Sequence, residues 1–137
     1  MSKEQLVIFR LGKEEYGAFI SQVREIIQYQ ETTKFPNAPA FLDGIINLRG
    51  RVIPIIHLAK QLQSGELTGE KLIVVIEIDG QMLGVVVNEV TEVAAIEAGA
   101  VEEAPMALTS GNESVVGIVK YEGRLIIIVD MSKLLNK

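Results

Sequence analysis

The chain has 137 residues, 48% of them hydrophobic, and a formal net charge of −5, so it can bury the core of one domain or of two small halves that share a core. The acidic balance disfavours generic binding to nucleic acid or to an anionic membrane, because both need a basic face. Cysteine is absent, which excludes a disulfide framework, a zinc–thiolate site and a thiol nucleophile. The apolar runs have strand length and the N-terminus lacks a signal peptide's apolar region, so we expect a soluble cytoplasmic protein.

The first part of the chain predicts three short strands and a long connection. Residues 6–11 and 16–21 flank a tight turn and indicate a hairpin. Residues 23–27 continue as an extended strand whose aliphatic residues do not alternate strictly, so we expect a bulge or bend near Arg24. Residues 28–41 contain two prolines and an asparagine, which is typical of a loop.

A second hairpin is predicted at residues 44–58. Two apolar runs, residues 44–48 and 52–56, flank a polar tip that contains a glycine. Residues 58–62 have helical spacing and predict a short helical turn. Residues 63–70 contain two glycines and a serine and indicate a hinge.

The rest of the chain repeats this pattern. Residues 83–93 match residues 16–26 (84 − 17 = 67), and residues 117–131 match residues 44–58 without a gap (117 − 44 = 73). The predicted strands of the second copy lie at residues 71–78, 82–88 and 90–96, with a long connection at 97–114 and a hairpin at 115–129.

We therefore expect a single domain, residues 1–137, made of two copies of one unit at about residues 5–62 and 71–135. Two copies are too few for a solenoid, which needs three or more repeats to bury its core. About five short strands per unit indicate an all-β protein with two small barrels related by an approximate two-fold. A helical turn should close each unit, and the C-terminal one should be better defined, since Asp130 is a stronger N-cap than His57.

The sequence gives little support to catalysis. His57, the one histidine, aligns with Asp130 of the other copy, so the two residues could form a dyad, but capping of a helical turn explains both better. There is no nucleophile elbow, no Gly-rich phosphate loop and no metal-ligand cluster, so we predict no catalytic residue, metal or cofactor. A small β-barrel ligand-binding protein or hydrolase that uses His57 is the alternative. A nucleic-acid-binding barrel is disfavoured by the acidic charge and the few aromatic residues.

The hairpin tips differ in charge between the two copies. Arg49 aligns with Glu122, and Asn47 aligns with Lys120, although the scaffold around them is retained. Divergence at exposed tips indicates a function that one half has and the other lacks. Arginine is a frequent interface anchor because its planar guanidinium donates several hydrogen bonds.

The bent strand of each copy is a second candidate surface. Glu25 and Glu92 occupy equivalent positions in these strands, and each lies among aliphatic residues. An apolar strip at the junction of two modules would form a groove for a partner helix, although about half of these aliphatic residues should belong to the core between the modules.

The run at residues 44–56, Gly-Ile-Ile-Asn-Leu-Arg-Gly-Arg-Val-Ile-Pro-Ile-Ile, resembles the signature of the CheW family of chemotaxis coupling proteins. Further residues support this resemblance: Tyr16, Gly17, Val23, Glu25, Ile26, Gly123, Arg124, Leu125 and the segment 36–39. The sequence departs from the family at His57, where an aspartate is common, and this should alter only a local turn.

The resemblance implies two SH3-like five-stranded β-barrels related by a pseudo-two-fold, with a shared hydrophobic core and a short C-terminal helix. It implies no catalysis. Such a protein is a cytoplasmic adaptor in a two-component signalling system, recruited to membrane receptor arrays. It bridges the cytoplasmic tip of methyl-accepting chemoreceptors to the regulatory domain of the histidine kinase CheA, with no nucleic acid and no insertion into the membrane. Since no receiver domain or kinase segment is present, a stand-alone coupling protein is favoured over a fused one.

By the same resemblance, the receptor would dock in the groove between the modules. The receptor-binding residues would be Val23, Glu25, Ile26, Ile27, Gly44, Asn47, Arg49 and Val93. Arg49 would supply charged hydrogen bonds, and Val23, Ile26 and Val93 would supply apolar area. The residues that contact the kinase stay unknown at this point.

Overall fold

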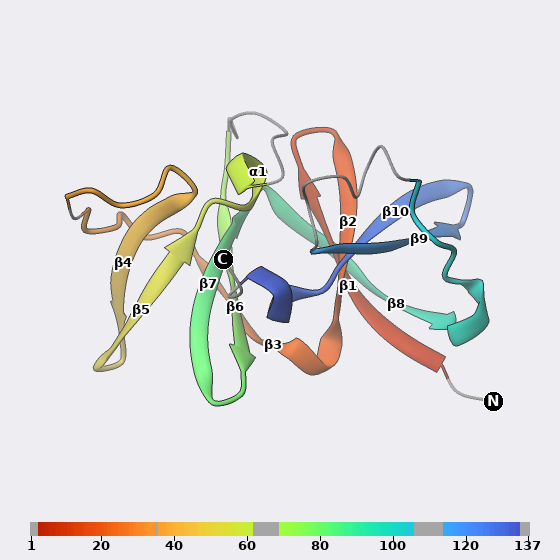
Figure 1. Ribbon diagram of the computed structural model, residues 1–137, viewed down its shortest axis with the longest axis horizontal. Coiled ribbons are helices and arrows are strands. Elements are labelled where there is room, and N and C mark those ends of the chain that lie inside the picture. The colour runs from red at the N-terminus through yellow and green to blue at the C-terminus, as the bar shows by residue number, and fades with distance from the viewer. Residues whose placement is uncertain (1–2, 35, 62–68, 106–113, 135–137) are drawn as a thin grey trace.

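The computed structural model describes residues 3–34, 36–61, 69–105 and 114–134. Within these residues, ten strands form two five-stranded sheets, which make up the two lobes seen in Figure 1. Helix is limited there to one short α-helix and three 3₁₀ turns. The expected all-β class is confirmed. Most of the predicted hinge, residues 63–68, lies outside the described residues.

The strands match the predicted segments closely. The first copy contributes β1 (Lys3–Leu11), β2 (Glu14–Phe19), β3 (Val23–Gln28), β4 (Leu42–Leu48) and β5 (Arg51–Ile56). The second copy contributes β6 (Leu72–Ile78), β7 (Gln81–Val87), β8 (Glu89–Glu97), β9 (Val115–Tyr121) and β10 (Arg124–Val129). The helical elements are η1 (Ile20–Gln22), α1 (Leu58–Gln61), η2 (Ala98–Ala100) and η3 (Met131–Leu134).

Two details differ from the sequence-based expectation and one agrees with it. Ile20 and Ser21, expected to end the second strand, belong to η1, where the chain crosses from one sheet to the other. The C-terminal turn η3 is a 3₁₀ helix whereas α1 is α-helical, so the C-terminal turn is not the more regular one. The register of β3 against β6 shifts between Val23 and Glu25, which confirms the irregularity expected near Arg24.

Each sheet contains strands from both copies. Sheet A has the strand order β8-β1-β2-β10-β9, and sheet B has the order β3-β6-β7-β5-β4. The opening hairpin of each copy therefore lies among strands of the other copy, and the expectation of one barrel per copy is wrong. The physical reason is the crossover at η1, which carries the chain out of sheet A after β2. Strands β1 to β5 of the first copy correspond to β6 to β10 of the second. Replacing each strand of sheet A by its equivalent in the other copy gives the strand order of sheet B, which confirms the pseudo-two-fold relation.

A parallel ladder joins the two copies in each sheet. Ile55 of β5 lies opposite Gly84 of β7, and Ile128 of β10 lies opposite Gly17 of β2. A Cβ atom on Gly84 would lie 2.6 Å from Ile55 Cδ1 and 2.7 Å from Ile73 Cγ2. Glycine therefore permits the close approach of strands at this joint.

The described part of the chain forms two hydrophobic clusters, and the larger one is shared by both sheets. It contains Phe9 and Tyr16 of sheet A, whose rings stack with centroids 6.0 Å apart, together with Ile55 and Val85 of sheet B. Buried Met131 of η3 joins the same cluster. The shared core implied by the resemblance is therefore present, and it holds the two sheets together.

Candidate docking site

Arg49 and Glu25 form an ion pair in which Arg49 Nη2 donates to Glu25 Oε2. Arg49 lies at the tip of the β4–β5 hairpin, and Glu25 lies on β3. Since β3 and β4 are opposite edges of sheet B, this pair shows that the sheet curls until its edges approach each other. The Arg49 side chain stays 66% exposed, against 28% for Glu25, so the guanidinium can still bind a partner.

The conformation of the tip is set by its backbone. Arg49 has φ 50 and Gly50 has φ 87, which is the pair of positive angles that a tight hairpin turn requires. The Asn47 side-chain oxygen accepts a hydrogen bond of 2.9 Å from the Gly50 N–H. Asn47 therefore shapes the site indirectly: its side chain stabilises the turn that presents Arg49.

The residues of β3 alternate between the core and the solvent. Val23 and Ile27 are half-buried and pack against the larger hydrophobic cluster. Ile26 is 43% exposed, so it is the aliphatic residue of β3 most available to a partner. Glu25, which pairs with Arg49, and Ile26 are consecutive residues of β3, so their side chains point to opposite faces of sheet B.

Val93 lies on the other sheet. It belongs to β8 of sheet A, opposite Val7, and it is 51% exposed. Its position corresponds to that of Ile26 in the first copy (93 − 26 = 67). The two exposed aliphatic residues are therefore related by the pseudo-two-fold, one on the outer strand of each sheet.

Gly44 is buried and cannot offer a side chain to a partner. Its φ is 149, and a Cβ atom there would lie 2.6 Å from Thr32 Oγ1 and 2.7 Å from the Thr33 carbonyl oxygen. Thr33 and Ile45 exchange backbone hydrogen bonds of 2.8 and 2.9 Å at the same place. Gly44 therefore lets the β3–β4 connection pack on β4.

A polar cluster fixes this connection, and sequence reasoning missed it. The Tyr29 hydroxyl donates to Asp43 Oδ2 at 2.9 Å, and Thr32 Oγ1 donates to the Asp43 carbonyl oxygen at 2.9 Å. Burial and the hydrogen bond to Asp43 raise the pKa of Tyr29 to about 12. Lys34 Nζ also donates to the Asp43 carbonyl oxygen, at 2.7 Å. Loop residues show no periodicity, so the only sequence signal was their polar composition.

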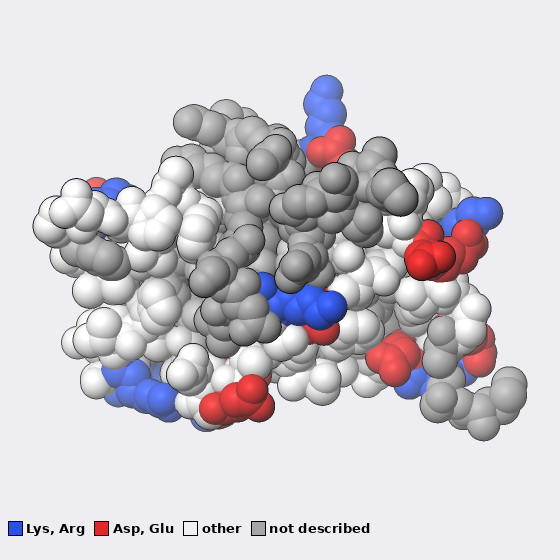
Figure 2. Space-filling model, in the orientation of Figure 1, with Lys and Arg blue, Asp and Glu red and all other residues white. Residues whose placement is uncertain are grey.

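A groove of about 520 Å³ lies beside Val23, between η1 and the β6–β7 turn. It is lined by Ser21, Gln22, Val23, Arg24, Glu77, Asp79 and Gly80. Arg24 Nη1 contacts Glu77 Oε1 across it at 2.6 Å. In Figure 2, basic side chains lie at the lower left, over the β4–β5 tip, and acidic side chains lie next to them, over the β6–β7 turn. This edge of sheet B therefore offers both charge signs beside a groove.

Glu92, the second copy's equivalent of Glu25, pairs with an arginine from a different position. Arg124, on β10, contacts Glu92 Oε2 at 2.6 Å and Glu15 Oε2 at 2.8 Å. Glu122 occupies the tip position that Arg49 holds in the first copy, and it lies 3.8 Å from Arg124. Both sheets therefore carry an arginine–glutamate pair, but only the first copy places an arginine at its hairpin tip.

The structure places His57 and Asp130 before helical turns, as the capping explanation requires. Asp130 Oδ1 accepts hydrogen bonds from the Ser132 N–H at 3.0 Å and from Gln22 Nε2 at 2.9 Å. The Met131 N–H donates to Gln22 Oε1 at 3.1 Å. Gln22, a residue that sequence reasoning did not select, therefore ties η3 to the crossover that leads into β3. His57 is buried directly before α1.

The described ranges contain no group of three or more histidine, aspartate or glutamate residues placed to hold a metal ion. In the same ranges, no helix has the length and apolar character needed to cross a membrane.

The CheW-like domain family matches residues 5–137. Chemotaxis protein CheW of Klebsiella aerogenes is 38% identical over 136 residues, which span 97% of this chain and 82% of that protein. Chemotaxis protein CheW of Treponema pallidum is 34% identical, with coverages of 96% and 82%. The crystal structure of the scaffolding protein TtCheW from Thermoanaerobacter tengcongensis superposes with a TM-score of 0.87 at 37% identity, over 94% of this chain and 85% of that one. The chain therefore belongs to the CheW-like domain family, whose members are chemotaxis scaffold proteins and not enzymes.

Proposed function

We propose that the protein is a cytoplasmic adaptor that couples membrane chemoreceptors to the histidine kinase CheA. The observation that carries the proposal is the exposed Arg49 guanidinium, which pairs with Glu25 where the two edges of sheet B approach each other. Arginine is enriched among the residues that dominate the binding energy of protein interfaces. The family membership supports partners among the components of chemotaxis signalling.

The receptor would dock through the cytoplasmic tip of its helical hairpin. Arg49 donates charged hydrogen bonds to it, and Glu25 orients the guanidinium. Ile26 supplies exposed apolar area on sheet B, as Val93 does on sheet A. Four further residues act mainly through shape: Val23, Ile27, Gly44 and Asn47.

The kinase would bind through its regulatory domain, at surfaces other than the receptor site. The protein then acts by position: it holds receptor and kinase in fixed geometry, so that a change in the receptor biases the kinase through a coupling free energy. In this account the protein is recruited to receptor arrays by its partners, without inserting into the membrane.

Binding of a soluble receptor fragment tests the docking site. Arg49→His and Glu25→Lys should each weaken binding at least about tenfold, because the interface loses its anchor or the residue that orients it. Both side chains lie at the surface, so the thermal unfolding midpoint should change little. Glu122→His is the matched control, since it alters the equivalent tip of the other copy and should leave the affinity unchanged. Parental affinity in both variants would refute the assignment.

A further inference from the structure

The pairing of strands separates into contacts within a copy and contacts between copies. Among the described residues, the strand pairs within a copy are hairpins only: β1–β2, β4–β5, β6–β7 and β9–β10. Between copies, the strand pairs are β1–β8, β2–β10, β3–β6 and β5–β7. The contacts between copies therefore assemble the hairpins into sheets.

A single copy would lose the strand pairs with the other copy and its share of the common hydrophobic cluster. β3 would have no neighbouring strand, because its one partner in sheet B is β6. The larger cluster would be divided as well, since Phe9 and Ile55 belong to the first copy while Val85 and Met131 belong to the second. Isolated two-stranded hairpins are marginal in water, so the contacts within a copy cannot sustain the fold.

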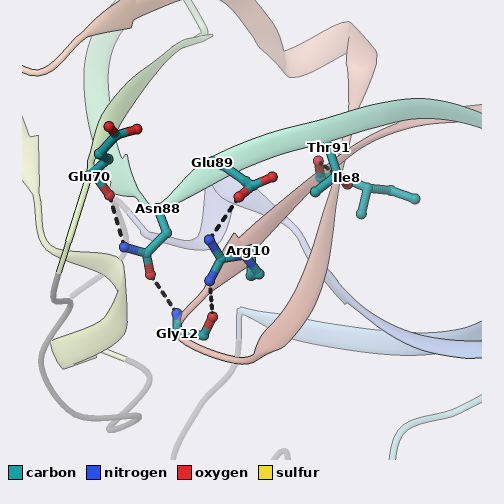
Figure 3. A network of polar contacts seen from close by, with 7 residues as sticks. All are labelled: Ile8, Arg10, Gly12, Glu70, Asn88, Glu89 and Thr91. Carbon is teal, nitrogen blue, oxygen red and sulfur yellow. Dashed lines mark hydrogen bonds and ion pairs between the residues drawn. The ribbon is translucent and has the colours of Figure 1, made fainter.

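The two contact regions between the copies are built differently, although the copies are related by a pseudo-two-fold. At one, shown in Figure 3, Asn88 Nδ2 donates to the Glu70 carbonyl oxygen at 3.0 Å, and Asn88 Oδ1 accepts from the Gly12 N–H at 2.6 Å. Arg10 Nη2 donates to Glu89 Oε1 at 2.8 Å beside it. The Asn88–Gly12 and Arg10–Glu89 bonds link the second copy to β1 and the turn that follows it, while the Asn88–Glu70 bond ties Asn88 to the connection between the copies.

The other contact region uses different residues. Gln22 is the counterpart of Glu89 (89 − 22 = 67), but it bonds to Asp130 and to the Met131 N–H. Asp130 aligns with buried His57 (130 − 57 = 73). Because the polar residues at the two regions differ, the first copy is complementary to the second copy and not to another first copy.

We propose that the two copies are obligate folding partners: each is unfolded alone, and each recognises the other specifically when the chain between them is cut. The partner that fits the surface between the copies is thus the complementary copy of the same unit. Folding and association are then a single event, as in segments that order only on binding.

The test uses the full-length protein with a protease recognition sequence inserted between Gly65 and Glu66, folded first and cleaved afterwards. The halves should co-elute on size exclusion with the circular dichroism spectrum of the uncut protein. The thermal midpoint of the cut protein should rise with concentration, because unfolding now releases two molecules. That of the uncut protein should not change. A half that separates and keeps its strand signal would overturn the proposal, and so would a concentration-independent midpoint of the cut protein.

Two glycine substitutions in the cut protein test the contact between the copies. Gly84→Ala should weaken association about tenfold or more, because the added methyl group overlaps Ile55 and Ile73 at the parallel joint. Gly99→Ala is the matched control, since nothing lies within 4 Å of a Cβ there, and association should stay within about twofold of the parent. Equal association of the Gly84→Ala protein and the parent would show that this joint does not hold the copies together.

Discussion

Gly44 contributes to the docking site through the space that it leaves free. Its φ of 149 and the nearby Thr32 and Thr33 atoms leave no room for a side chain. Gly44→Ala should therefore lower the free energy of unfolding by about 2–4 kcal/mol, through backbone strain and overlap with the β3–β4 connection. Urea denaturation measures this loss. Gly99→Ala, in open space, should stay near the parent, and equal midpoints for the two variants would contradict the account.

Asp130 should make part of the stability depend on pH. Partial burial would raise the pKa of Asp130, but hydrogen bonds from Gln22 and Ser132 outweigh burial and hold the pKa below its usual value. A lowered folded-state pKa gives a stabilisation that is present above the unfolded-state pKa, near about 4, and is lost as the pH falls through the folded-state value.

Asp130→Asn removes this titration and keeps an oxygen that can accept the Gln22 hydrogen bond. From about pH 5 down to about pH 2, its thermal midpoint should therefore fall less than that of the parent. Differential scanning calorimetry across this range measures the difference. If the thermal midpoints of the two proteins fall equally over this pH range, the Asp130 hydrogen bonds do not favour its charged form.

At the scale of the elements, three hairpins share one turn. Arg49, Asp79 and Glu122 have φ values of 50, 51 and 51, and each is followed by a glycine with positive φ. Such turns favour Asn-Gly and Asp-Gly, so arginine and glutamate are poor residues for the first position. The turn itself therefore favours neither Arg49 nor Glu122, and what separates the two tips is the exposed charge that Arg49 presents, paired with Glu25.

Arg49→Asn and Glu122→Asn separate stability from binding, because they make the same change at equivalent turns. Both thermal midpoints should equal or exceed that of the parent, since asparagine tolerates the positive φ. Only Arg49→Asn should weaken binding of the receptor fragment, by about tenfold or more. Calorimetry and titration of the fragment give both quantities. Equal weakening by the two variants would place the docking site on both tips or on neither.

The sequence predicted the strands and hairpins well because their signals are local. Alternating apolar residues and glycine-containing turns define the β4–β5 hairpin, and the aligned copies reveal the pseudo-two-fold. The curl that brings Arg49 to Glu25, 24 residues away, has no local signal. Neither does the packing of Thr32 against Gly44, which depends on how a loop folds back.

At the scale of the whole molecule, the sequence could not reveal that the copies exchange hairpins. The opening hairpins of the two copies are alike, so a local pattern fits either sheet equally well. The choice depends on the crossover at η1 and on the joints at Gly17 and Gly84. The result is a pair of lobes with one shared core, and in the proposed function this gives the adaptor a fixed geometry between its two partners.

Recruitment of the kinase CheA to membrane vesicles that contain a chemoreceptor tests the proposed coupling most directly. In a sedimentation assay, adding the protein should increase the amount of kinase that pellets with the vesicles. The Glu122→Asn protein should match the parent, and the Arg49→Asn protein should leave the kinase in the supernatant. Kinase that sediments equally with and without the protein would contradict the account.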